Sequence, residues 1–363
     1  MTRLAGVDAA RAVAVAGMVI VNFEVVMFAG DRGPGWLRAM VGGLEGRAAA
    51  AFVVLAGVGA SLMTARARRR GDLVELEAGR RRLLRRAGFL LVVGYLFVLV
   101  WPADILHYYA FYLGLGSLLL GASDRALWGW AAAAAALFAA LYTFAGYWDQ
   151  LDAVDLVYDG FWTPVGLVRN LVFNGWHPVL PWIGFYLAGM WLGRRDLADR
   201  RVRWRIAAVA AAVAAAAETV AAFFEPIVFD IVTTGPSSLG VVAGNRALLA
   251  AEPLPPGPVY LLAAGGTAVV MVVLCVEAGV RWPGSAAVRW AARTGELAMT
   301  IYFAHVLVGM GTLEALGQLH SQPLWFAVTC AGLFLVASVV FSVAWRRRFE
   351  RGPVESVMRR IAG

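Results

Sequence analysis

Long apolar runs alternate with short polar segments along almost the whole chain of 363 residues. Each run approaches the roughly 20 apolar residues that a helix needs to cross a bilayer. The pattern therefore predicts an all-α fold: a polytopic membrane bundle of about ten transmembrane helices, in one domain that covers 1–363. The predicted spans are 9–29, 47–65, 87–101, 105–122, 127–147, 178–193, 206–224, 258–279, 296–317 and 323–345.

The arginines indicate how these helices are oriented. All 32 basic residues are arginine, and 27 of them lie in alternate segments that begin with the N-terminal one, which leaves five for the segments between. Because basic residues accumulate on the cytoplasmic side of membrane helices, we predict that both termini are cytoplasmic. The predicted cytoplasmic basic loops are 66–86 and 194–205, the cytoplasmic tail is 346–363, and the long outer loops are 148–176 and 225–258.

Composition agrees with a membrane protein. Hydrophobic residues make up 61% of the chain and charged residues only 15%, too few to cover a soluble protein of this length. The net charge of +8 is concentrated at helix ends, which favours anionic lipid headgroups rather than nucleic acid as its partners. Cys275 and Cys330 fall in apolar runs, with neither the spacing of a metal site nor that of a disulfide framework.

The two long outer loops are candidates to cover a site, because loops of this length usually carry a function or are disordered. In the first loop, Trp162 and Pro164 introduce an apolar stretch, 165–173, that could form a short interfacial or re-entrant helix.

Few polar side chains lie inside the predicted spans, and the cost of placing them in lipid makes each a functional candidate. Asp8 and Arg11 stand three residues apart at the inner end of the first helix, where they can pair as an interfacial anchor or as support for a site. Asn22 indicates that this helix faces a polar interior. Arg47 opens the second helix on the outer side, where arginine is rare. Glu218, in the seventh helix, is either a buried hydrogen-bonded carboxyl or a site acid.

The histidines are the strongest candidates, because histidine suits proton transfer near neutral pH. His305 lies nine residues into the ninth span, about 14 Å deep, where only a specific partner can offset its desolvation. Tyr302 shares its helix face at a spacing of three. His177 and His107 stand at the outer ends of the sixth and fourth spans. No spacing among the histidines resembles a zinc site and no paired carboxylates indicate a metal cage, so we expect no metal.

Several segments, in order along the chain, resemble one known family. The opening stretch Arg3–Asn22, with Asp8 and Arg11, is similar to the start of the heparan-alpha-glucosaminide N-acetyltransferase-like membrane proteins, and more loosely to that of the transmembrane acyltransferase superfamily. The other segments that look like this family or its bacterial relatives are Gly46–Gly59, Arg80–Arg86, His177–Arg194, Thr294–His305 and Phe349–Glu355.

The resemblance implies an acyltransferase of the bacterial cytoplasmic (inner) membrane. Members of the family take an acetyl group from acetyl-CoA on the cytoplasmic side and deliver it across the membrane to a sugar amine or hydroxyl, with a histidine central to the chemistry. In the animal enzyme that histidine lies between the first two helices, and this chain has none between Asn22 and Gly46. If the activity is retained, His177 or His305 must take its place.

A catalytic site of this kind gives the polar residues roles. His305 or His177 would act as the general base. Asn22, Arg47 and Tyr302 would stabilise the developing oxyanion if they converge.

The expected co-substrate, acyl-CoA, also needs a cationic site that binds its phosphates. The densest arginine cluster would form this site. Asp8, Arg11 and Glu218 would support the site. The arginines of the cluster are Arg68, Arg69, Arg70, Arg80, Arg81 and Arg82.

Two other functions remain open from the sequence. The same polar residues could line a transporter or flippase for a lipid or an amphiphilic small molecule, or the chain could be a non-catalytic subunit of a membrane assembly. The expected partners of an acyltransferase are membrane lipids and a small-molecule, lipid-linked or glycan acceptor. We expect no nucleic acid, and a homodimer is possible.

Overall fold

The computed structural model describes residues 5–145, 147, 151, 152, 156–234 and 245–363, so Arg3 of the family-like opening lies outside the described residues. The fold is an all-α bundle, as the hydropathy pattern predicts. Two short strands, β1 (Leu151–Asp152) and β2 (Val157–Tyr158), form an antiparallel pair. The long helices are α1 (Ala5–Val26), α3 (Arg47–Met63), α5 (Leu73–Val98), α6 (Leu106–Leu118), α7 (Asp124–Ala145), α9 (Val179–Leu192), α10 (Arg200–Thr234), α12 (Pro258–Arg281) and α16 (Leu324–Trp345). The shorter helices are α2 (Gly35–Gly42), α4 (Ala65–Arg70), α8 (Pro164–Arg169), η1 (Asn170–Asn174), η3 (Arg246–Leu249), α13 (Ala286–Gly295), α14 (Ala298–Ala304), η4 (His305–Met310), α15 (Gly311–Ala315) and α17 (Pro353–Ala362).

Seven helical stretches in the described part of the chain are long and apolar enough to cross a membrane: Ala5–Val26, Gly35–Met63, Asp124–Ala145, Arg200–Phe224, Pro258–Arg281, Ala298–Ala315 and Leu324–Trp345. The chain is therefore a multi-pass membrane protein. The three other predicted spans are also helices, but α6 and α9 are shorter, with 13 and 14 residues, and the first half of α5 carries several arginines. The number of ten crossings stays a prediction.

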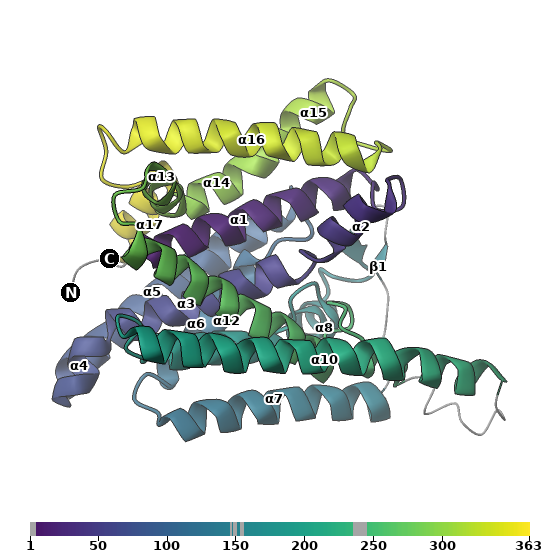
Figure 1. The fold of residues 1–363 in the computed structure, drawn as a ribbon, viewed down its shortest axis with the longest axis horizontal. Helices are drawn as coiled ribbons and strands as arrows, with labels where there is room; N and C mark the ends of the chain where they lie inside the picture. Colours follow the sequence, from purple (N-terminus) through teal and green to yellow (C-terminus); the bar gives the residue numbers. More distant parts are fainter. Residues whose placement is uncertain (1–4, 146, 148–150, 153–155, 235–244) are drawn as a thin grey trace.

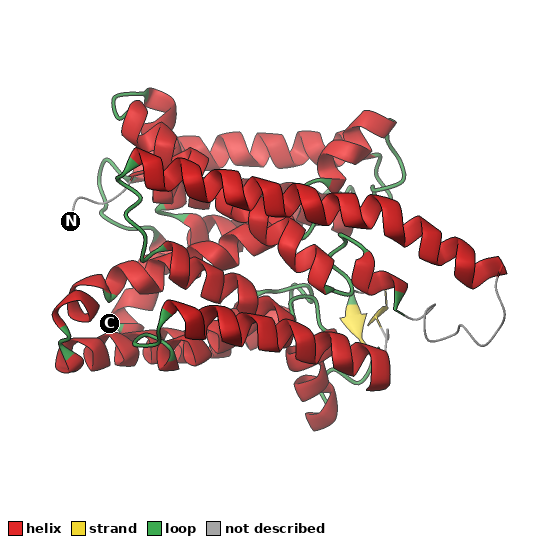
Figure 2. Cartoon of the chain, turned by 60° about the horizontal axis from the view of Figure 1, so that its bottom comes forward, coloured by secondary structure: helices red, strands yellow, loops and turns green. Residues whose placement is uncertain are grey.

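The helices run between two ends of the bundle. In Figure 1, the start of α1 and the end of α17 lie at the same end, together with α4 and α13. We call this the basic end, because α4 carries the arginine run 68–70. Helices α2 and α15 and the β1–β2 pair lie at the opposite end, and Figure 2 shows the strands at the end away from both termini.

One predicted boundary is wrong. The third helix begins at Leu73 rather than near 87, because the side chain of Asp72 caps it by accepting the Glu75 N–H at 2.9 Å, and arginines interrupt hydropathy without interrupting a helix. The helix of the seventh predicted span continues to Thr234 through Pro226, but its part that is apolar enough to cross a membrane ends at Phe224, where the sequence predicts the end of the span. The short helix expected within 165–173 is present as α8 and η1; Thr163 caps it by accepting the Gly166 N–H.

The centre of the bundle is made by α1, α3, α9 and α12, which pack on one another. Small residues allow α3 and α9 to touch backbone to backbone: a side chain at Gly57 would collide with the Tyr186 carbonyl oxygen, and one at Gly189 with the Val54 carbonyl oxygen. The helices α7 and α10 lie outside this centre, against α9 and α12 respectively. Of the candidate residues, this core carries Asp8, Arg11 and Asn22 on α1 and Arg47 on α3.

Candidate active site

A cavity of about 170 Å³ lies toward the end opposite the basic end. Asn22 lines it from the last part of α1, His177 from just before α9, and Tyr302 from α14. We call it the aromatic cavity, because three tryptophans also line it: Trp101, Trp176 and Trp182. Both long outer loops reach it, the first through Trp176 and the second through Pro253 and Leu254.

His305 lies directly behind Asn22. Its Nε2 is 3.0 Å from Asn22 Nδ2, and its Nδ1 contacts the carbonyl oxygen of Tyr302. A carbonyl oxygen only accepts, so Nδ1 must carry the proton and donate it to that oxygen. Nε2 is then an acceptor, and the Asn22 amide donates to it. The buried ring therefore presents a basic lone pair toward the residue that forms the cavity wall.

Local structure explains how His305 reaches α1. The helix changes from α14 to the π-helical segment η4 at His305 itself, and such segments occur frequently at functional sites. Gly309, one turn further, has no side chain, and a β-carbon there would lie 2.9 Å from the ring of Phe23 in α1. The close approach of η4 to α1 brings His305 and Asn22 together.

Asp104 is the functional candidate that sequence reasoning missed. It is fully buried, and its two carboxylate oxygens accept hydrogen bonds from the Tyr302 hydroxyl at 2.8 Å, the Leu106 N–H at 2.8 Å and the His107 N–H at 3.3 Å. His107 Nδ1 lies 3.2 Å from the same carboxylate. In the sequence, Asp104 is a single acid near Trp101 and Pro102, between two predicted spans. The hydropathy pattern at this position indicates a solvated loop residue.

The two outer histidines lie near each other but are held differently. His107 Nε2 and His177 Nδ1 are both buried without a hydrogen-bond partner in the described structure. His177 precedes α9, and burial, with His107 nearby, lowers its pKa to about 3, so its ring is neutral at pH 7. Its carbonyl oxygen accepts from the Tyr112 hydroxyl at 2.6 Å. Only His177 of this pair lines the aromatic cavity.

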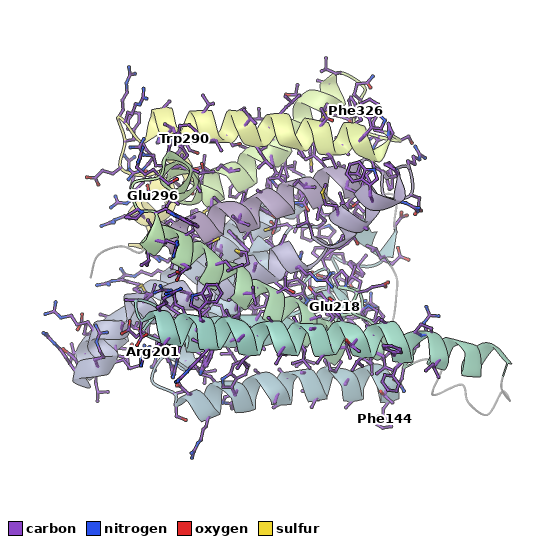
Figure 3. The ribbon with its side chains drawn as sticks, viewed as in Figure 1. Phe144, Arg201, Glu218, Trp290, Glu296 and Phe326 are labelled. Carbon is purple, nitrogen blue, oxygen red and sulfur yellow. The ribbon has the colours of Figure 1, made fainter. Side chains whose placement is uncertain are left out.

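Arg47 and Glu218 form an ion pair that links α3 to α10. Glu218 lies on α10 (Figure 3), and its side chain is nearly half exposed, so it is not a fully buried acid. Neither residue lines the aromatic cavity, although Gly46, next to Arg47, does. The structure therefore brings Asn22, Tyr302, His177 and His305 together and places this pair beside them.

A second, larger cavity, of about 880 Å³, opens at the basic end. Asp8 and Arg11, which pair at 2.5 Å, line it on one side, and Arg68, Arg69 and Arg194 line it on the others. We call it the basic cavity. Arg68 Nη1 and Arg194 Nε are buried and have no hydrogen-bond partner among the described residues.

The electrostatics of the basic cavity favour an anion. Burial and then the nearby charges of Arg194, Arg69 and Arg195 lower the pKa of Arg68 to about 10, and burial lowers the pKa of Arg194. A pKa falls in this way when a cation loses water and lies among like charges. Arg194 already pairs with Asp124 at 2.9 Å, so an added phosphate would chiefly relieve Arg68.

The rest of the predicted arginine cluster lies away from the basic cavity. Arg80 pairs with Glu77 at 3.1 Å and donates to the Ser117 carbonyl oxygen at 3.3 Å, and Arg81 pairs with Glu77 at 3.4 Å. Arg70 and Arg82 are exposed. Of the six arginines in the cluster, only Arg68 and Arg69 line the cavity; Arg11, Arg194 and Arg195 join them from other segments.

Comparison with known families places the two parts of this site in different regions. Residues 3–224 match the family described as heparan-alpha-glucosaminide N-acetyltransferase, catalytic, and residues 256–363 match a family described as a protein of unknown function (DUF418). No curated protein matches the chain. Asn22, Asp104 and His177 thus belong to the first region, while Tyr302 and His305 belong to the second. Because the first match covers more than half of the chain, the protein belongs to the heparan-alpha-glucosaminide N-acetyltransferase family of membrane proteins.

Proposed function

We propose that the protein transfers an acyl group, most simply acetyl, from acyl-CoA at the basic end to an acceptor at the aromatic cavity. The observation that carries this proposal is the contact between Asn22 and His305 at the wall of that cavity. This chain has no histidine between its first two predicted helices. His305 instead contacts Asn22 from a helix that lies 283 residues further along the sequence.

The chemistry follows from the tautomer of His305. As the acceptor nitrogen or oxygen attacks the thioester carbon, Nε2 accepts its proton in place of the Asn22 N–H. The released Asn22 amide can then donate to the carbonyl oxygen, which gains negative charge. The C–S bond breaks, and the protonated His305 returns its proton to the leaving thiolate. The products are the acylated acceptor and CoA thiol.

The basic cavity supports the donor side of this proposal. Arg68 Nη1 and Arg194 Nε are buried donors that no described residue binds, which suits the phosphates of CoA. If the basic end is cytoplasmic, as the arginine distribution predicts, the donor enters from the compartment that contains acyl-CoA. The acceptor then approaches from the outer side of what we propose to be a bacterial inner membrane, as a saccharide, a lipid-linked sugar or a small molecule.

The test is turnover by the purified protein in liposomes. Acetyl-CoA and an amino sugar are supplied on opposite sides, and release of CoA thiol is measured. Replacing His305 by glutamine removes the base, and we expect the rate to fall about 10²- to 10⁴-fold. The matched control is His320→Gln, because the His320 side chain is largely exposed, pairs with Glu314 and the Val26 carbonyl oxygen, and does not line the cavity.

The possible results separate the alternatives. Wild-type turnover in His305→Gln, combined with loss in His177→Gln, would move the base to His177. If the wild-type protein consumes no acyl-CoA but moves a labelled lipid between leaflets, the transporter alternative replaces the proposal.

A further inference from the structure

A third cavity, of about 340 Å³, lies between α3, α5, α6, α14 and α17. Most of its wall is hydrocarbon, so we call it the apolar cavity; its larger apolar side chains include Phe52, Leu55, Leu90, Leu113, Met299 and Met358. It extends along α3 from Phe52 to Met63, about 16 Å at 1.5 Å per residue. This shape suits a chain-like ligand, and its volume is within the range of ligand pockets.

Two polar groups in the wall have no hydrogen-bond or ion-pair partner among the described residues. The Tyr109 hydroxyl is buried without any hydrogen-bond partner in the described structure, although a buried hydroxyl normally has one. Arg86 makes no hydrogen bond or ion pair with a residue that the structure describes. Its charged neighbours are Arg82, Arg359 and Arg11, so it lies among like charges. A ligand with one anionic group and one carbonyl oxygen would satisfy both groups.

The acids in the same wall are already occupied. Glu296 pairs with Arg346, and Glu355 accepts from the backbone N–H groups of Met299 and Thr300 at 2.9 and 3.0 Å. They cannot neutralise Arg86 without giving up these contacts, so the unmet charge of the cavity is positive.

The apolar cavity lies next to both of the others. Arg11 and Gly59 line it together with the basic cavity. At its far end, the rings of Phe52 and Tyr109 pack with centroids 5.5 Å apart. Ala49 and Ile105, one helical turn before each of these rings, line the aromatic cavity. A ligand here would end within about 6 Å, one turn, of the aromatic cavity.

We propose that the apolar cavity binds an anionic fatty-acyl amphiphile, whose anionic group lies at Arg86 and whose carbonyl oxygen accepts from the Tyr109 hydroxyl. Two kinds of molecule combine an anionic group with a fatty-acyl chain in this way: an anionic membrane lipid and a long-chain acyl-CoA. Binding at this cavity is independent of the proposed acetyl transfer and would persist in a protein with His305 replaced.

The experiment measures thermal unfolding of the delipidated full-length protein in non-ionic detergent, because a ligand of the folded state raises the melting temperature. The probes are palmitoyl-lysophosphatidylglycerol, palmitoyl-lysophosphatidylcholine with the same chain and no net charge, palmitoyl-CoA and acetyl-CoA. We expect the anionic palmitoyl lipid to raise the melting temperature more than its zwitterionic counterpart. If palmitoyl-CoA raises the melting temperature through the same residues and the anionic lipid does not, the bound fatty-acyl group would be that of the acyl-CoA donor.

Two nearly isosteric variants test the assignment. Arg86→Gln should raise the concentration needed for half of the shift about tenfold, the effect of one charged hydrogen bond, and Tyr109→Phe should raise it about fivefold. The controls are Arg82→Gln, an exposed neighbour outside the cavity, and Tyr186→Phe, which removes another buried hydroxyl without a partner from outside it. Both controls should behave as the wild type.

A third variant, Ala56→Leu, narrows the cavity while Arg86 and Tyr109 are kept, and it should abolish the lipid response. It keeps the test decisive if Arg86→Gln or Tyr109→Phe does not fold. Equal responses to the anionic and zwitterionic lipids, or a lipid response unchanged in all three variants, would overturn the proposal. So would a protein that responds to acetyl-CoA alone through Tyr109, because the cavity would then be an extension of the donor site.

Discussion

At the scale of single residues, Asn22 and His305 are functional candidates in the sequence because polar side chains are costly to place in a bilayer. The structure places the two side chains in contact. The same argument could not identify Asp104. A hydropathy pattern assigns a residue between two spans to solvent. Only the structure shows that this carboxylate, in the turn before α6, is buried and accepts a hydrogen bond from the Tyr302 hydroxyl of α14.

Asp104 also provides a test at this scale. The variant Asp104→Asn keeps the size of the side chain but replaces one acceptor oxygen by a donor that faces N–H groups. We expect a loss of about 1–3 kcal/mol, the cost of leaving buried donors without partners, seen as a lower melting temperature. Asp199→Asn, at an exposed aspartate that accepts the Arg201 N–H, should change it little. Unfolding of Asp104→Asn at the wild-type temperature would argue against the network around it.

At the scale of elements, the apolar runs predict that the helices exist. Charged residues conceal where the third of them begins. The sequence predicts a loop for the arginines of 66–86, yet they lie in α4 and in the first half of α5. Once this segment is helical, its arginines face different ways. Arg68 of α4 lies in the basic cavity, whereas Arg81 of α5 pairs with Glu77 on its own helix.

This division predicts which element holds the donor. Acetyl-CoA should raise the melting temperature of the protein, and the double variant Arg68→Gln with Arg69→Gln should reduce that rise by removing two cations from the cavity. The double variant Arg81→Gln with Arg82→Gln removes the same charge from outside the cavity and should leave the rise intact. The opposite result would return the donor to the cluster in α5, as the sequence first suggested.

At the scale of the whole molecule, alternation of arginine predicted that the basic segments share one side, and α4, α13 and α17 do lie at one end of the bundle (Figure 1). No pattern along the chain could predict which cavities that bundle would enclose. These depend on close crossings such as that of Gly57 with the Tyr186 carbonyl oxygen, which join helices far apart in sequence.

The side of the membrane can be tested by labelling. In a background with Cys275 and Cys330 replaced by alanine, single cysteines are introduced at Trp36 in α2 and at Arg70 in α4, both exposed and at opposite ends. A membrane-impermeant maleimide applied to intact cells should label Trp36→Cys at once, and Arg70→Cys only after lysis. The reverse order would place the basic end outside the cell and remove the route for cytoplasmic acyl-CoA.

The partnership of Asn22 with His305 has a consequence for biosynthesis. The ribosome releases α1 long before it releases η4, and the portion that matches the acetyltransferase family is already inserted while the histidine is still to be made. A nascent or truncated polypeptide that stops at 224 would carry the asparagine without its base. Under the proposed mechanism, such a product would be inserted in the membrane but inactive until the C-terminal part of the chain has been synthesised.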